Sequence, residues 1–377
     1  GLPRMYGRIA NPSVSPVLSW IAKTVDAISA KVDKGASCNT LSGIGSFGLE
    51  LRAISRETGN PKYKQAAERI ERFIYDQWKS RKEKTGFQHK YWNIMPQYRN
   101  DTFDFIGSCH WAQSEIAFGS GGDSFYEYLL KEQIIEPDGT EFLKEMYNAF
   151  VSTVEDRSAT KDKKVVYVSN DKRRTLVHIF LENVAPHLVC FGGGLLALGA
   201  HHFEDHKVDM ELAKEVGEQC VKFYETPTGL AADVTAIMPD GTTKPYTKHV
   251  GYQLRPETVE TLFVLFQTTG DDKYREMGWK IFEAIEKHCK IQSGGYSGVR
   301  DVLQIPIDHD NHMPSYFLAE TLKYLLLLFE GNASLSLNEY IFTTEGHPIT
   351  IDSTCKYRER EGLPRCSGQM TRQYYNG

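Results

Sequence analysis

The chain has 377 residues, a formal net charge of −5 at pH 7 and a charged fraction of 25%. Apolar residues make up 41% of it, the usual share in soluble globular proteins, which excludes a disordered or collagen-like chain. The mild acidity and the lack of a basic run argue against nucleic-acid binding, and no apolar stretch reaches the roughly 18 residues of a membrane span.

The first residues are Gly-Leu-Pro-Arg, without a basic-then-apolar leader, so we expect an earlier segment to be missing from the chain. The seven cysteines include no CxxC pair, which argues against a disulfide scaffold and against a structural zinc site. Sequons at Asn100 and Asn332 permit N-glycosylation if the chain is secreted.

Helical periodicity dominates the sequence. Apolar residues follow the i, i+3, i+4, i+7 spacing of a buried helix face, or one close to it, at Val259, Leu262, Phe263 and Phe266 and at Leu318, Leu322, Leu325 and Phe329. Strand-like alternation is confined to short pieces such as 164–168. This pattern excludes a doubly wound sheet and predicts an all-α fold.

One helical hairpin is repeated in the sequence. Thr58-Gly-Asn-Pro-Lys-Tyr-Lys has its counterpart in Thr269-Gly-Asp-Asp-Lys-Tyr-Arg. In both segments an apolar helix is expected to end at the Thr-Gly pair and a second helix to begin near Lys-Tyr. Repeated hairpins without a fixed period favour a closed ring, an α/α toroid whose end loops carry the chemistry.

Asp123 stands between a glycine-rich segment and an aromatic helix. Ser124 and Glu127 have the spacing of a capping box, which explains both residues structurally. Asp123 is not needed for that cap. A carboxylate beside aromatic rings is typical of sugar-binding sites, although an ordinary loop acid would also explain it.

The histidine-rich segment 201–206 lacks the HExxH spacing of a zinc site, and we interpret it as a solvated loop. In the segment Arg255 to Glu260, Pro256 suits the first helical position and places Glu257 and Glu260 in the first turn. The two acids either complement the helix dipole in solvent or form a carboxylate pair with Arg255 as counter-charge.

Two later segments also carry unusual polar residues. Glu320 lies in an apolar helix with tyrosines four residues away on each side, so it faces a polar cavity or pairs with Lys323 on a solvated face. The segment Phe342 to His347 follows a β-like run and offers oxygen donors that suit a hard cation such as calcium. One short segment cannot supply all the ligands of that ion.

Taken in order, these segments resemble glycoside hydrolase family 47, the class I α-1,2-mannosidases that trim N-glycans in the secretory pathway. The resemblance covers residues 36–350. The matching segments are Asp123-Ser-Phe-Tyr-Glu-Tyr-Leu-Leu, His187-Leu-Val-Cys-Phe191, Leu254-Arg-Pro-Glu-Thr-Val-Glu260, Gly294-Gly-Tyr-Ser-Gly298, Phe317-Leu-Ala-Glu-Thr-Leu-Lys-Tyr324 and Phe342-Thr-Thr-Glu-Gly-His347.

The resemblance implies an (α/α)7 barrel that hydrolyses terminal α-1,2-linked mannose with inversion, using a calcium ion deep in the barrel. Glu257 matches the general base, and Asp123 matches a catalytic acidic residue. Thr344 matches the threonine that binds Ca²⁺ through its hydroxyl and carbonyl oxygens. We expect the surrounding glutamates to hold waters of the ion rather than to bind it directly.

Further residues match the mannose subsite. Arg255, His187, Glu260, Glu320 and Glu345 line it in the family, Tyr316 holds the place of a stacking aromatic, and Glu50 is a retained family glutamate. Cys190 and Cys220 match the positions of a family disulfide. We expect Arg255, Glu257, Glu260, Glu320, Asp123 and Thr344 to converge on one cavity along the ring axis.

The sequence also departs from the family. It contains no Phe-Glu-x-x-Ile-Arg-x-Leu-Gly-Gly segment, which carries the general-acid glutamate, and Gly43 stands where a glutamate is usual. We therefore expect one barrel domain at 1–352 without its first hairpins, and a tail at 353–377 that has no assignment. The Thr-Thr-Glu-Gly-His ending is closer to the degradation-enhancing branch, whereas the Arg-Pro-Glu-Thr-Val-Glu segment favours the processing enzymes.

Three functions compete on this basis. The first is calcium-dependent processing of high-mannose N-glycans on glycoproteins in the lumen of the endoplasmic reticulum or Golgi, with any membrane anchor upstream of this segment. The second is a glycan-binding or weakly active protein of the quality-control pathway that lacks the general acid. The third, a purely structural helical scaffold, would leave Glu257, Glu260, Glu320 and Asp123 unexplained.

Overall fold

The computed structural model describes residues 41–84, 96–97, 115–116, 119, 122–158, 184–207, 209–238, 241–330 and 335–351. Several sequence predictions lie outside these residues: the strand-like piece at 164–168, both sequons, Cys38, Cys109, Cys355, Cys366 and the tail at 353–377.

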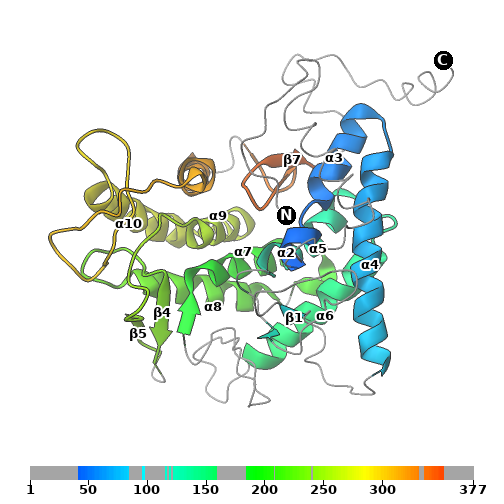
Figure 1. The fold of residues 1–377 in the computed structure, drawn as a ribbon, viewed down its shortest axis with the longest axis horizontal. Helices are drawn as coiled ribbons and strands as arrows, with labels where there is room; N and C mark the ends of the chain where they lie inside the picture. Colours follow the sequence, from blue (N-terminus) through cyan, green and yellow to red (C-terminus); the bar gives the residue numbers. More distant parts are fainter. Residues whose placement is uncertain are drawn as a thin grey trace, which may run out of the picture.

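Helices make up most of the described chain (Figure 1). The α-helices are α2 (Leu41–Gly45), α3 (Gly48–Thr58), α4 (Lys62–Lys84), α5 (Asp123–Ile135), α6 (Glu141–Ser158), α7 (Phe191–His202), α8 (Asp209–Val221), α9 (Glu257–Thr269), α10 (Lys273–His288) and α11 (Lys323–Glu330). Short 3₁₀ turns form η2 (His187–Cys190), η3 (Glu204–His206) and η4 (Lys222–Tyr224), and η5 (Phe317–Leu322) is a π-helix. Among the described helices, none has the length and apolar character needed to cross a membrane.

The repeated hairpin predicted from the sequence is confirmed. Gly59 and Gly270 end α3 and α9 in the left-handed region, with φ of 70° and 68°. The next residue, Asn60 or Asp271, accepts a hydrogen bond from the backbone N–H two residues later, at 3.1 and 3.0 Å. Glycine avoids the Cβ strain of this conformation, so the same turn chemistry starts α4 and α10.

The hairpins follow one another around a ring. The helices α3, α5, α7, α9 and α11 each contact the next, and their hairpin partners α4, α6, α8 and α10 pack on them. The first set includes α5 and α7, which are buried almost throughout, whereas α8 and α10 bury one face only. The first set therefore forms an inner layer, and the all-α toroid predicted from the sequence is confirmed (Figure 1).

Short strands complete the ring. Strands β3 (Val184–Pro186), β4 (Val234–Ile237) and β5 (Thr243–Pro245) form an antiparallel sheet, and β1 (Pro96–Gln97) pairs with β2 (Glu115–Ile116). Strands β6 (Tyr340–Phe342) and β7 (Pro348–Thr350) form a hairpin in which Tyr340 pairs with Thr350. Arg56 of α3 donates a hydrogen bond of 2.7 Å to the Thr350 carbonyl, so β7 lies beside the first described hairpin (Figure 1).

One apolar cluster runs through the helices from α2 to α11 and into β6. The disulfide between Cys190 and Cys220 ties η2 to α8 within it, with 5.9 Å between the two Cα atoms, so this predicted pairing is confirmed. On the α3 side, the buried Arg52 guanidinium pairs with Glu71 of α4 and Glu132 of α5 at 2.6 Å each. These contacts fix the positions of the inner helices relative to one another.

The predicted apolar stripe of α9 is buried at Val259, Leu262 and Phe263. The stripe that begins at Leu318 is wrong at its first residue, because Leu318 is 58% exposed and the neighbouring Phe317 is fully buried instead. Leu318 lies in the π-helix η5, whose wider turn shifts the side chains away from the α-helical spacing on which the prediction relied.

Candidate active site

The predicted site residues lie where inner helices begin. Glu50 is in the first turn of α3, Asp123 is the first residue of α5, Glu257 starts α9, and Glu320 is in the first turn of η5. Because an outer helix returns the chain between successive inner helices, the inner helices run in one direction and their N-termini meet at one end of the ring. The positive ends of the helix dipoles favour carboxylates there.

Glu257 is held by a buried histidine. Its Oε2 lies 2.8 Å from Nδ1 of His187, which occupies the 3₁₀ turn before α7, and its Oε1 lies 4.0 Å from Nη1 of Arg255. Burial alone would raise the pKa of Glu257, but the hydrogen bond from His187 and the charge of Arg255 outweigh it and lower the pKa. Glu257 is therefore an ionised carboxylate, as a general base requires.

Arg255 is itself fixed by neighbours that the sequence did not reveal. Its Nε donates to Asp233 Oδ1 at 2.5 Å, and the Tyr316 hydroxyl donates to the Gln253 carbonyl at 2.8 Å. Between Gln253 and Arg255, Leu254 is fully buried with a φ of 59°, a left-handed conformation that costs a non-glycine residue about 1–3 kcal/mol. Strain of this kind is characteristic of functional segments, and Leu254 lies between the two residues that contact Asp233 and Tyr316.

Asp123 has a pKa displaced in the opposite direction from that of Glu257. Burial raises it, the Ser124 backbone N–H, which donates to Asp123 Oδ1 at 2.9 Å, offsets part of the rise, and the charges of Glu127 and Glu257 add to it, so that the pKa lies at about 6. The capping box predicted for Ser124 and Glu127 is wrong, because Gly122 caps α5 without a side-chain hydrogen bond. Glu127 turns inward instead.

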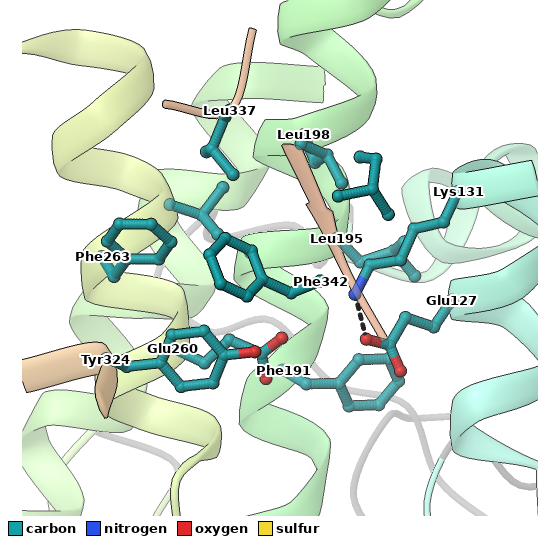
Figure 2. Close-up of a pocket in the computed structure, with 13 residues that line it drawn as sticks. Glu127, Lys131, Phe191, Leu195, Leu198, Glu260, Phe263, Tyr324, Leu337 and Phe342 are labelled. Atoms are coloured by element: carbon teal, nitrogen blue, oxygen red, sulfur yellow. Dashed lines mark hydrogen bonds and ion pairs between the residues drawn. The ribbon is translucent and has the colours of Figure 1, made fainter. Parts of the chain in front are cut away.

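Glu127 forms a buried ion pair with Lys131, one helical turn later in α5. Both residues are buried and line a pocket with about 360 Å³ of empty space among α5, α7, α9, α11 and β6. Figure 2 shows this pair on one side of the pocket and Glu260 with Tyr324 on the other. The charges of Glu127 and Glu257 both act on Asp123, and these three residues form an acidic cluster. Buried charges are costly unless they are paired, and Lys131 supplies the pairing charge, a role that the sequence did not reveal.

Glu260 and Glu320 extend the acidic cluster. Burial raises the pKa of both, and repulsion adds to it: Glu127 and Glu257 act on Glu260, while Glu260 and Glu345 act on Glu320, whose pKa rises to about 9. The alternative of a solvated Glu320 paired with Lys323 is wrong. Glu320 is 6% exposed, and Lys323 donates to the Gly346 carbonyl at 2.8 Å.

Thr344 lies in the turn between β6 and β7. This turn packs against η5, because a Cβ added to Gly346 would lie 2.9 Å from the Ala319 carbonyl oxygen. The Tyr128 hydroxyl reaches the Thr344 backbone and donates to Glu50 Oε1 at 2.8 Å. The other oxygen of Glu50, Oε2, is buried without a hydrogen-bond partner among the described residues. An unpaired carboxylate oxygen beside a threonine fits a hydrated hard cation.

The side-chain groups placed near Thr344 by these contacts, the Tyr128 hydroxyl and the Glu50 carboxylate, carry oxygen. Glu345 is exposed, yet its charge raises the pKa of Glu50 and Glu320, so it adds to the same negative field. Within the described part of the chain, no group of three or more His, Cys, Asp or Glu residues is arranged to hold a metal directly. A cation here would depend on Thr344, with carboxylates reaching it through water.

The histidine-rich segment differs from its prediction. His206 is 5% exposed rather than solvated, and its ring nitrogens bond to Asp209 at 2.7 Å and Asn148 at 2.9 Å. The short η3 turn brings the ring inward, so His206 pins the loop between α7 and α8 to α6.

The chain is similar in sequence to known proteins. Glycosyl hydrolase family 47 matches residues 4–351. The chain is 34% identical to mannosyl-oligosaccharide alpha-1,2-mannosidase IA of Drosophila melanogaster, covering 84% of the chain and 45% of that protein. It is also 34% identical to the human endoplasmic reticulum mannosyl-oligosaccharide 1,2-alpha-mannosidase, covering 84% of the chain and 44% of that protein. The chain spans about half the length of the curated relatives it matches.

A solved structure is similar as well. It is an alpha-1,2-mannosidase from Trichoderma reesei, with a TM-score of 0.69 and 25% sequence identity, covering 85% of the chain and 67% of that structure. The likeness extends the agreement in sequence to the arrangement of the helices.

Proposed function

Since the chain belongs to glycosyl hydrolase family 47, we propose that it acts in the hydrolysis of terminal α-1,2-linked mannose from high-mannose N-glycans, with inversion at the anomeric carbon. One observation carries this proposal: the site displaces two carboxyl pKa values in opposite directions, that of Glu257 downward and that of Asp123 to about 6. Carboxyl groups whose environments differ in this way can serve as base and acid of one reaction.

In the proposed reaction Glu257 acts as the general base. One O–H bond of a water breaks and its proton passes to Glu257, while the water oxygen attacks the anomeric carbon and the glycosidic C–O bond breaks. The leaving oxygen takes a proton from an acid. Asp123 is the described carboxyl of intermediate pKa, so it is our candidate for handling that proton, and inversion requires the two carboxyls to be about 6.5–9.5 Å apart.

The mannose subsite would be formed around the same helix ends. Arg255, fixed by Asp233, and the carboxylates of Glu260, Glu320 and Glu345 can bond to sugar hydroxyls. Tyr316 can stack on the sugar ring, because the hydrogen bond from its hydroxyl to Gln253 restrains it. Glu50 would form part of the floor of the subsite.

We further propose that the reaction depends on Ca²⁺. Thr344 would hold the ion by its hydroxyl and carbonyl oxygens, and Glu50 and Glu320 would accept hydrogen bonds from its waters. When bound, the ion would offset the negative charge of the acidic cluster and polarise oxygens that approach it. The unpaired Oε2 of Glu50 and the raised pKa of Glu320 support this assignment.

The proposal places the protein in the lumen of the endoplasmic reticulum or Golgi. The human relative cited above is named as an endoplasmic reticulum enzyme. The Cys190–Cys220 disulfide adds support, because such bonds persist in oxidising compartments.

A second candidate is a glycan-binding protein of the quality-control pathway with weak activity or none. The segment Phe342 to His347, whose Thr-Thr-Glu-Gly-His ending is closer to the degradation-enhancing branch, favours it. General acid catalysis contributes about 10²–10⁴-fold, so a site without its acid would bind glycans and turn them over slowly.

The test incubates the protein with a high-mannose N-glycan and follows mannose release, with the anomer of the first product read by NMR. Release of β-mannose that falls about 10²–10⁴-fold in Glu257→Gln supports the proposal. Glu283→Gln, on the exposed face of α10, is the matched control and should leave the rate unchanged. Glycan binding without release would favour the second candidate. A protein that neither binds the glycan nor releases mannose would refute both candidates.

A further inference from the structure

The histidine that holds Glu257 is itself held by two hydroxyls. Nε2 of His187 lies 2.9 Å from the Tyr224 hydroxyl and 3.0 Å from Oγ1 of Thr258. Tyr224 comes from η4, after the helix that carries Cys220, and Thr258 follows Glu257 in α9. All three side chains are buried, with His187 1% exposed and Thr258 fully buried, so no bulk water competes for these bonds.

The chemistry of an imidazole ring restricts the arrangement. A neutral histidine carries one N–H, on either Nδ1 or Nε2. Nδ1 faces the Glu257 carboxylate, which accepts hydrogen bonds and cannot donate when ionised, so the proton belongs on Nδ1. Nε2 then has a free lone pair, and it meets two hydroxyl groups, each of which can donate to it.

The arrangement also gives the two carboxylate oxygens of Glu257 different surroundings. Oε2 is engaged by His187, whereas the nearest positive group to Oε1 is Nη1 of Arg255 at 4.0 Å, beyond hydrogen-bond distance. Oε1 is therefore the oxygen available to a water. If the ring turned or the tautomer changed, Oε2 would lose its donor and the carboxylate could rotate.

We propose that Tyr224 and Thr258 are positioning residues for the general base: their hydroxyls fix His187 as the Nδ1–H tautomer, which anchors Glu257 Oε2 and presents Oε1 to the attacking water. This inference rests on the proposed function for its kinetic consequence, but the tautomer itself is a property of the folded chain. The ring of Tyr224 meets that of His187 edge-on at 5.8 Å between centroids, so the tyrosine restrains the orientation of the imidazole as well.

The inference has a direct spectroscopic test. Ring-nitrogen NMR of the histidine-labelled protein should show His187 with Nδ1 protonated and Nε2 unprotonated at neutral pH. The His187→Gln variant identifies its signals among the 12 histidines. In the Tyr224→Phe, Thr258→Val double variant the Nε2 signal should shift or split, because both donors are gone. A wild-type ring protonated on Nε2, or a double variant with an unchanged signal, overturns the proposal.

Kinetics give a second, independent reading. Each single variant keeps one donor and should lose little activity, whereas the double variant should lose about 10- to 100-fold in kcat, part of the contribution of a general base, with KM little changed. Tyr274→Phe removes another fully buried tyrosine hydroxyl, in α10, and should leave kcat at the wild-type value. Thermal unfolding confirms that each variant is folded.

The two proposals fail in different ways. A wild-type protein that releases no mannose contradicts the proposed function, and the NMR experiment then decides the tautomer alone. A wild-type protein that is active, with a double variant of equal kcat and equal nitrogen shifts, contradicts only the positioning role.

Discussion

The Tyr128 hydroxyl donates a hydrogen bond of 2.8 Å to Oε1 of Glu50 and so joins α5 to α3 beside the Thr344 backbone. Glu50 is left with one buried oxygen that has no partner in the described part of the chain. Desolvation raises the pKa of Glu50, and the charges of Glu127 and Glu345 raise it further. A carboxylate placed in this way is destabilising unless a cation is nearby.

Calcium should therefore stabilise the folded chain. Millimolar Ca²⁺ should raise the Tm above its value in chelator. A free Ca²⁺ concentration of 100 times Kd would add about 2.7 kcal/mol to the free energy of unfolding. Thr344→Ala removes one donor and should reduce the shift without unfolding the chain. Differential scanning calorimetry measures both.

Thr343 supplies the matched control. Its Oγ1 accepts from the backbone N–H groups of Glu345 and His347 at 3.3 and 3.2 Å, so Thr343→Ala should lower the Tm while it keeps the calcium-dependent shift. An equal shift in wild type and Thr344→Ala, or no shift in either, would show that Thr344 holds no calcium.

The free energy of unfolding in chelator should depend on pH through Glu320. Its ordinary pKa is 4.5 and its folded pKa is about 9, so between these values the folded chain keeps a proton that the unfolded chain has lost. Raising the pH through this window therefore favours unfolding, with a slope of up to about 1.4 kcal/mol per pH unit.

Urea unfolding at several pH values measures this slope. Glu320→Gln has no charge to bury and should reduce it, leaving the part that comes from Glu260, and calcium should reduce it in the wild type by favouring the ionised carboxylate. A stability that rises with pH in chelator, or a slope unchanged in Glu320→Gln, contradicts the prediction.

The Lys131–Glu127 pair should behave as a buried unit. Lys131→Met leaves the Glu127 carboxylate buried without its partner, and breaking a buried pair in this way costs about 3–5 kcal/mol of stability. The Glu127→Gln, Lys131→Met double variant has no unpaired charge and should recover much of that loss. Urea unfolding of the wild type, Glu127→Gln, Lys131→Met and the double variant gives the coupling energy, and strictly additive losses would show that the pair is not a unit.

The disulfide should stabilise the chain through the loop it closes. Cys190 and Cys220 are 30 residues apart, and the chain-entropy relation then gives about 3–4 kcal/mol for their bond. Cys190→Ala with Cys220→Ala should lower the free energy of unfolding by this amount and make it insensitive to reductant. Cys289→Ala, at a buried free cysteine, serves as the control and should retain the reductant sensitivity.

The hairpin turns were predictable because their determinants are local. A glycine that must be left-handed and an Asn or Asp that bonds two residues ahead can be read at 58–62 and at 269–273 without knowledge of the rest of the fold. The acids that start α5 and α9 were found in the same way, from their position next to helix-start signals.

The errors arose where distant contacts decide the structure. Glu127 has the spacing of a cap, but Lys131 and the pocket draw it inward, and nothing in the sequence shows that this side of α5 is enclosed. Leu318 was misplaced because a π-helix cannot be read from apolar spacing. Asp233 was missed because its only signal is its contact with Arg255, which comes from a separate segment of the chain.

The bond between Arg56 and Thr350 spans 294 positions of the chain. At a synthesis rate of about 5–20 residues per second, the α3–α4 hairpin waits roughly 15–60 s for the strand that covers it. The 30-residue loop closed by Cys190 and Cys220 is complete within a few seconds of its first cysteine at the same rate. The nascent chain therefore holds both cysteines of the disulfide well before it holds β7, and the contact between Arg56 and Thr350 can form only after residue 350 has been made.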